Sequence, residues 1–138
     1  MPPHTLPAHT TGTATLTVDP TDLASHLGLD PADVFPPVFA TSRMVSLMEL
    51  AAARAMRPIL GPGELSVGVG IDVMHSAPTP LGATVRATAE FLGMDGKLYL
   101  FRIQAADDAG EIGTGTHRRA VVSAERLVAA AQRRRPTR

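Results

Sequence analysis

The sequence predicts an α+β fold in which a curved antiparallel β-sheet wraps around one long central helix. Three observations lead to this prediction: an alternating segment near the N-terminus, a long and almost wholly apolar segment at 41–56, and a series of alternating segments from 65 to 122. The chain has 138 residues, enough for one domain with a hydrophobic core but not for two of ordinary size. We expect a loose N-terminus at 1–11, a single domain at 12–132 and a basic tail at 133–138.

Composition and charge exclude several classes of function. Thirteen basic and thirteen acidic side chains cancel, and only 4% of the residues are aromatic, so we expect no nucleic-acid partner. The absence of cysteine excludes disulfides, thiolate metal sites and a cysteine nucleophile. The N-terminus lacks the basic and apolar regions of a signal peptide, and no run of about 18 apolar residues occurs. We therefore expect a soluble, cytoplasmic protein with no membrane partner.

The part of the chain before the apolar segment is predicted to hold one strand and a long loop. At 13–19 the residues alternate, and Ala14, Leu16 and Val18 share one face, as in a strand with one side on the core. The segment 20–37 contains four prolines, so we expect a loop with short helical pieces there.

The segment 41–56 is predicted to be a helix that other elements cover on most sides. Its apolar stretch is interrupted by only three polar residues: Ser46, Glu49 and Arg54. We expect a hydroxyl of Thr41 or Ser42 to cap the N-terminus, and Pro58 and Gly61 to mark the end.

The rest of the domain is predicted to be a run of four strands and a short amphipathic helix at 123–132. The turn at Asp95 and Gly96 is typical of an antiparallel hairpin. Such a sheet has exposed edges and leaves the helix half covered, so we expect a homodimer that pairs through edge strands. The predicted strands are 65–75, 83–93, 98–107 and 111–122.

Glu49 is the first candidate for chemistry, because a carboxylate at the centre of an apolar helix requires an explanation. Its neighbours on the helix surface are mostly small, which leaves room for a ligand. The same stripe, with Ser46 as its other polar member, also fits the solvent face of the helix. A buried, unpaired Glu would be costly, so its surroundings decide between the two interpretations.

Three further residues are candidates by their position. His75 ends a strand at the rim of a loop, where a histidine is available for proton transfer or is simply exposed. Thr41 is either a helix cap or, at a helix N-terminus, part of an anion site. Gly68 and Gly70 lie within a strand, so they form no phosphate-binding loop and instead permit a close approach of backbone or ligand.

Four segments carry a resemblance to a known family. They are FPPVFAT from Phe35, MVSLMELAAARAM from Met44, VGVGIDVMHSAPTPLGATV from Val67 and EIGTGTHRRAV from Glu111. Together, as far as Val122, they resemble the fluoroacetyl-CoA thioesterases, a branch of the hotdog-fold thioesterases. The resemblance implies the hotdog fold and the hydrolysis of a small acyl-CoA to free acid and CoA. It implies no metal and no cofactor, since coenzyme A is part of the substrate.

The resemblance also implies a site. It places an amide that polarises the thioester carbonyl at Gly68, a supporting charge at Arg119 and an aromatic gate at Phe35. The carboxylate of the catalytic set either attacks the thioester or activates water, and the sequence does not separate these roles. The catalytic positions that match are Thr41, Glu49 and His75.

Two departures from the family pattern affect the expected substrate. Ser42 and Arg43 stand where the family has Gly-Phe, and Ala32 replaces a second gate Phe. We call these positions the lid of the expected site. With these changes the lid would admit a larger acyl group or lose discrimination between fluorinated and ordinary acyl groups. Two other functions stay open: a non-catalytic acyl-CoA or small-ligand binding protein, and a dehydratase or isomerase on the same fold. The acyl group, and whether CoA or a carrier protein bears it, also stay open.

Overall fold

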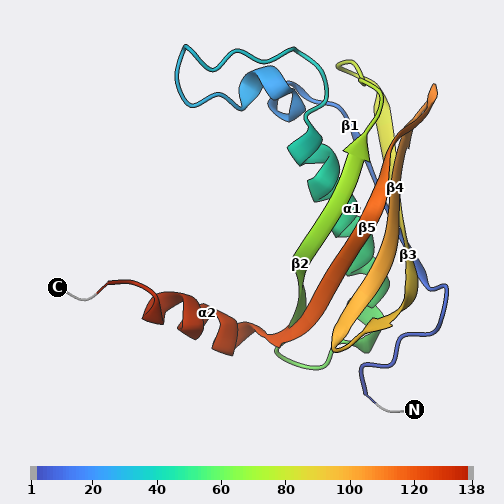
Figure 1. Ribbon diagram of the computed structural model, residues 1–138, viewed down its shortest axis with the longest axis vertical. Coiled ribbons are helices and arrows are strands. Elements are labelled where there is room, and N and C mark those ends of the chain that lie inside the picture. The colour runs from blue at the N-terminus through green and yellow to red at the C-terminus, as the bar shows by residue number, and fades with distance from the viewer. Residues whose placement is uncertain (1–2, 137–138) are drawn as a thin grey trace.

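The computed structural model describes residues 3–136 (Figure 1). Five strands and two α-helices follow one another in the predicted order, and three short 3-10 helices lie in the connections. The strands are β1 (Thr11–Thr17), β2 (Glu64–His75), β3 (Thr84–Asp95), β4 (Leu98–Asp107) and β5 (Gly110–Ser123). The helices are α1 (Thr41–Met56) and α2 (Ala124–Arg133), and the 3-10 helices are η1 (Pro20–Asp22), η2 (Ala24–His26) and η3 (Arg57–Ile59).

The strands form one antiparallel sheet in the order β1-β3-β4-β5-β2. The sheet curls around α1, which lies along its concave face (Figure 1). This confirms the predicted hotdog fold. β1 and β2 are the two edges of the sheet, so α1 is bordered on one side by β1 and on the other by β2.

The core lies between α1 and the inner face of the sheet, and the predicted alternation produces it. In β3 as far as Phe91, and in β4 from Tyr99 to Ala105, every second side chain is buried. Val85, Phe101 and Ile103 are at 0% exposure. β1 approaches α1 so closely that a Cβ at Gly12 would overlap with the carbonyl oxygen of Ala51. The buried residues of α1 are Met44, Leu47, Met48, Ala51, Ala52, Ala55 and Met56.

β2 differs from the regular strand that its sequence predicts. The register with β5 shifts between Gly68 and Gly70, so the alternation breaks at this point. β2 is also an edge of the sheet, where Val69 and Ile71 are 52% and 39% exposed, and Met74 is exposed as well. The edge strand β2 therefore presents apolar side chains that this chain leaves uncovered.

The N-terminus of α1 also differs from the prediction. The N-cap is Ala40, which makes no side-chain cap hydrogen bond, so the predicted cap at Thr41 or Ser42 is wrong. The helix starts here because the preceding backbone is tied down: Phe39 N–H donates to Thr79 O at 2.9 Å, and Ala40 N–H donates to Asp22 O at 2.9 Å. The hydroxyl of Thr41 is consequently not used as a cap.

The two ends of the described chain lie against the domain in different ways. Leu6 is buried with the core, and the Tyr99 hydroxyl donates a hydrogen bond to the carbonyl of His4. α2 is capped by Ser123 and points away from the sheet (Figure 1). The division into a loose N-terminus, a domain and a basic tail stays a prediction, and residues 1–2 and 137–138 lie outside the described part. No helix within 3–136 has the length and apolar character that crossing a membrane requires.

Candidate active site

Thr41 and His75 meet at one end of α1. The Thr41 hydroxyl oxygen lies 2.7 Å from His75 Nδ1, and both residues line a pocket of about 400 Å³. Thr41 is the first residue of α1, and His75 is the last residue of β2. His75 Nε2 is buried and has no hydrogen-bond partner among the described residues. A hydroxyl that is hydrogen-bonded to an imidazole, with the second ring nitrogen unpaired, is suited to proton transfer.

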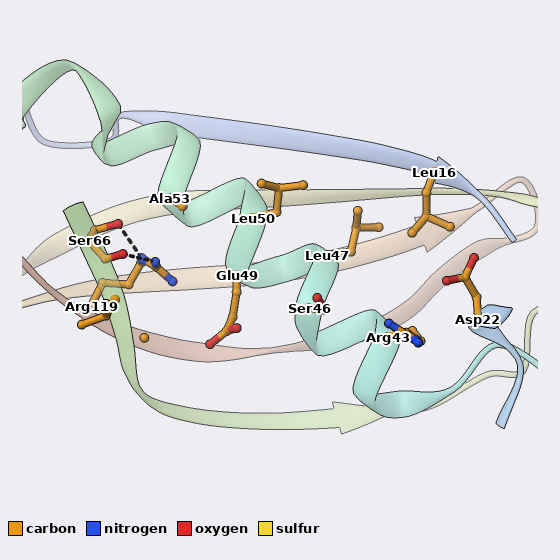
Figure 2. A pocket seen from close by; sticks show the side chains of 12 residues that line it. Leu16, Asp22, Arg43, Ser46, Leu47, Glu49, Leu50, Ala53, Ser66 and Arg119 are labelled. Carbon is orange, nitrogen blue, oxygen red and sulfur yellow. Dashed lines mark hydrogen bonds between the residues drawn. The ribbon is translucent and has the colours of Figure 1, made fainter. Parts of the chain in front are cut away.

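Glu49 and Gly68 meet further along α1. A Cβ at Gly68 would overlap with Glu49 Oε1, so only glycine lets the carboxylate lie against β2 at this point. Glu49 is partly buried and lines an open pocket of about 610 Å³. Figure 2 shows its carboxylate pointing from α1 toward β2, on the side of Arg119, while Arg43 and Asp22 lie at the other end of the pocket. Glu49 therefore lies in the wall of a pocket, and its catalytic role stays a prediction.

Within one chain, the pair of Thr41 and His75 lies apart from the pair of Glu49 and Gly68. Thr41 and Glu49 are eight positions apart on α1, which corresponds to about 12 Å along the helix axis. They line different pockets, and neither pocket contains both residues. Of the three predicted catalytic residues, a single chain thus brings together Thr41 and His75 but not Glu49.

The predicted gate residue is placed near the first pocket but not in its wall. Phe35 is 49% exposed in the connection before α1, whereas Pro36 and Val38 from the same connection line the pocket of Thr41 and His75. Its role as a gate stays a prediction. Within residues 3–136 no group of three or more His, Asp or Glu side chains is arranged to hold a metal ion.

Comparisons with known proteins agree on the family and the fold. A model of the family described as fluoroacetyl-CoA-specific thioesterase matches residues 18–125. A fluoroacetyl-CoA thioesterase from Streptantibioticus cattleyicolor is 49% identical over 102 residues, which are 74% of this chain and 73% of the relative. A solved structure of the fluoroacetyl-CoA thioesterase FlK matches with a TM-score of 0.89 at 42% identity, over 96% of this chain and 99% of that chain. The chain belongs to the fluoroacetyl-CoA-specific thioesterase family.

A further relative is informative about ligands. A variant of FlK solved in complex with fluoroacetate and CoA matches with a TM-score of 0.82 at 43% identity, over 88% of this chain and 98% of that chain. Membership of the family makes this protein a thioester hydrolase.

In this thioesterase, Arg119 is held by more partners than the sequence indicated. It is 6% exposed, and its guanidinium donates to the hydroxyl and carbonyl oxygens of Ser66 at 3.0 and 2.9 Å (Figure 2). Its third contact is His117 Nε2 at 3.1 Å. Burial lowers the pKa of Arg119, and the nearby Glu49 carboxylate acts in the opposite direction.

Sequence reasoning missed Ser66 and His117 as members of this site. His117 is completely buried in β5, and burial is the main reason that its pKa is lowered. A signal was available: His117 and Arg119 are two apart in a strand and therefore share a face. A polar pair on the inner face of a sheet requires partners.

Proposed function

We propose that this protein hydrolyses small acyl-CoA thioesters to the free acid and CoA. The observation that carries the proposal is the Thr41–His75 pair, with its 2.7 Å contact and the unpartnered, buried Nε2 of His75. A complex of the related FlK with fluoroacetate and CoA supports CoA, rather than a carrier protein, as the thiol carrier. The substrate brings the CoA, so the proposed reaction needs no separate cofactor.

The residues have distinct proposed roles. Glu49 either activates the water that attacks the thioester carbonyl, which gives the acid as the bond from carbon to sulfur breaks, or attacks the carbonyl itself. In the second route the same bond breaks to leave an anhydride on Glu49, and water then hydrolyses this anhydride to release the acid. Thr41 orients the carbonyl, and His75 delivers a proton to the departing thiolate. The backbone N–H of Gly68 stabilises the oxyanion, an effect worth several kcal/mol when the donor is preorganised. Arg119 supplies a supporting positive charge, and Phe35 acts as a gate.

We further propose that the working unit is a homodimer, because one chain separates the two halves of this site. β2 is the edge that favours a second copy: it exposes Val69, Ile71 and Met74, whereas the exposed positions of β1 are threonines. Pairing two copies of β2 would cover these apolar side chains and the unpaired edge.

The contacts within the chain define where a two-fold axis would complete the site. Thr41 contacts His75, and Glu49 contacts Gly68, so α1 and β2 run in opposite directions along this face. On α1 the midpoint between Thr41 and Glu49 is Val45. On β2 the midpoint between Gly68 and His75 lies between positions 71 and 72. A two-fold axis that passes outside the chain, beside the free edge of β2 and level with these midpoints, exchanges the two ends of two copies. It would place Glu49 and Gly68 of one copy over Thr41 and His75 of the other, which is the full predicted set.

The acyl specificity of this member need not be that of FlK. Arg43 lines the pocket of Glu49, at the position where the family has an aromatic residue, and Ala32 replaces a gate Phe. We propose that the altered lid accepts acyl groups other than fluoroacetyl. We also propose that the protein acts in the cytoplasm.

The test is thiol release, read with a thiol-reactive dye, from fluoroacetyl-, acetyl-, propionyl- and longer acyl-CoA. We expect turnover of at least one of them, and we expect Glu49→Gln to lower kcat by roughly 100- to 10,000-fold while the fold is kept. Glu125→Gln, the same change on the exposed face of α2, is the matched control and should retain the wild-type rate. If no acyl-CoA of the panel releases thiol but the protein still binds acyl-CoA, the protein is a binding protein instead.

A further inference from the structure

His117 holds two groups of the site at once. Its Nδ1 lies 2.8 Å from the carbonyl oxygen of Gly70, directly after the shift in register of β2. Its Nε2 lies 3.1 Å from a terminal nitrogen of Arg119. The ring also packs behind the strand, since a Cβ at Gly68 would stand 3.0 Å from His117 Cε1.

These two contacts determine the protonation state of His117. The carbonyl of Gly70 only accepts hydrogen bonds, so Nδ1 must carry a proton. The guanidinium of Arg119 only donates, so Nε2 must be free to accept. Only the neutral imidazole with its proton on Nδ1 satisfies both. Adding a second proton would place a donor against a donor at a ring that has no exposed surface.

The groups that face the ring act in both directions, and burial, which favours the neutral form, has the largest effect. From β5 itself Arg119 disfavours a positive charge on His117, and burial disfavours it more strongly. From β2 the Gly70 carbonyl accepts from Nδ1–H and favours the charged form. From α1 the Glu49 carboxylate also favours the charged form but contributes least.

The contact with His117 fixes the position of the Arg119 guanidinium. The guanidinium makes two bonds to Ser66 and one to His117, so its position relative to Glu49 is determined from both sides. Removing the acceptor on His117 would leave a buried N–H of Arg119 without a partner and would free the group to move. The Gly70 carbonyl would be released at the same time, and with it the irregular part of β2 that presents Gly68.

We propose that His117 is a positioning residue of the thioesterase site, which as its neutral Nδ1–H tautomer holds Arg119 beside Glu49 and anchors the irregular turn of β2 behind Gly68. It touches no reacting atom and acts through Arg119 and β2. The inference rests on the proposed function for its kinetic consequence, but the tautomer is a property of the folded protein alone.

The first test is independent of catalysis. Long-range proton–nitrogen correlation spectra of the ¹⁵N-labelled full chain report which ring nitrogen of each histidine carries the proton. We expect His117 to be protonated on Nδ1 only and to stay neutral at about pH 6.5, where an ordinary histidine is half charged. A proton on Nε2, or an imidazolium at that pH, would overturn the proposal even if the enzyme is active.

The second test uses a double-mutant cycle on thiol release from the best acyl-CoA of the panel. We expect His117→Phe to lower kcat by roughly 10- to 100-fold, since displacement of site groups by about 1 Å has such an effect. His117→Gln, whose amide can both donate to Gly70 and accept from Arg119, should recover most of the loss. In an Arg119→Met background His117→Phe should lower kcat by a smaller factor than in the wild type, because the part of its effect that passes through Arg119 is already gone.

The controls separate the possible failures. His26→Gln changes an exposed histidine outside both pockets and should retain the wild-type kcat. Full additivity of His117→Phe and Arg119→Met, or a wild-type kcat in folded His117→Phe, contradicts the positioning role. If His117→Phe does not fold, the kcat of His117→Gln and the His117 tautomer of the wild-type protein still test the positioning role. A wild-type chain that is inactive on every acyl-CoA refutes the proposed function, whereas the spectra still test His117.

Discussion

At the scale of single residues, the site depends on groups that the rest of the fold leaves free. The helix begins at a cap that uses no side chain, so the hydroxyl of Thr41 is available to His75. Gly68 is small enough for Glu49 to lie against the strand. Neither property is visible in a list of residue types, because both depend on what the neighbouring backbone does.

The burial of His117 also has a consequence for stability. Its pKa in the folded protein is lowered from the ordinary 6.5, mainly by burial, so below that pH the unfolded chain binds a proton that the native chain excludes. The stability that this group contributes is therefore complete above about pH 6.5 and is lost as the pH falls toward the folded pKa. The slope is at most about 1.4 kcal/mol per pH unit.

We therefore expect the melting temperature of the wild-type protein to fall more steeply between about pH 7 and 5.5 than that of His117→Gln. The lowered pKa values of Asp19 and Glu64, caused mainly by their hydrogen bonds to Thr21 and His4, act at lower pH, because their ordinary values are 3.8 and 4.5. Parallel melting curves for the two proteins over this range would show that His117 is not a buried neutral histidine.

At the scale of elements, packing of α1 into the sheet is what positions both halves of the site. β1 lies against α1 at Gly12, where a side chain would overlap with Ala51 and approach the backbone nitrogen of Ala55 to 2.7 Å. On the other side the residues of β2 contact the polar stripe of α1. The helix is thus held between the two edge strands, and its apolar face lies on β3 and β4.

We expect Gly12→Ala to destabilise the protein by about 1–3 kcal/mol, because β1 must move away from the helix backbone. Thermal or urea unfolding measures this, with Thr15→Ala on the exposed side of the same strand as the control. The folded variant should keep its turnover, since the change lies on the edge opposite to β2. Unchanged stability would mean that β1 and α1 are less closely packed than described.

Much of the element order follows from sequence periodicity, whereas local irregularities do not. The alternation of β3 and β4 and the long apolar helix predicted their positions to within a few residues. The irregular step at Gly68 to Gly70 and the cap at Ala40 arise from tertiary contacts, so no local pattern indicates them. The roles of Ser66 and His117 were missed because the contacts of Ser66 with Arg119 and of His117 with Gly70 join different strands.

At the scale of the whole molecule, the proposed active site is complete only with a second copy of the chain. A single chain has Thr41 with His75 in one pocket and Glu49 with Gly68 in another, about 12 Å apart along α1. The exposed apolar side chains of β2 lie between these two places. The proposed homodimer explains both observations together, since one symmetry axis covers the edge and unites the site.

The measurement that tests this most directly is complementation between two inactive variants, Glu49→Gln and His75→Gln, mixed by co-expression. A site shared between copies gives each mixed dimer one intact site, so thiol release should return to about a quarter of the wild-type rate when pairing is random. A site contained within one chain would leave every copy defective. Mixed dimers that form, as two distinct affinity tags would establish, but remain as inactive as either variant alone would contradict the account.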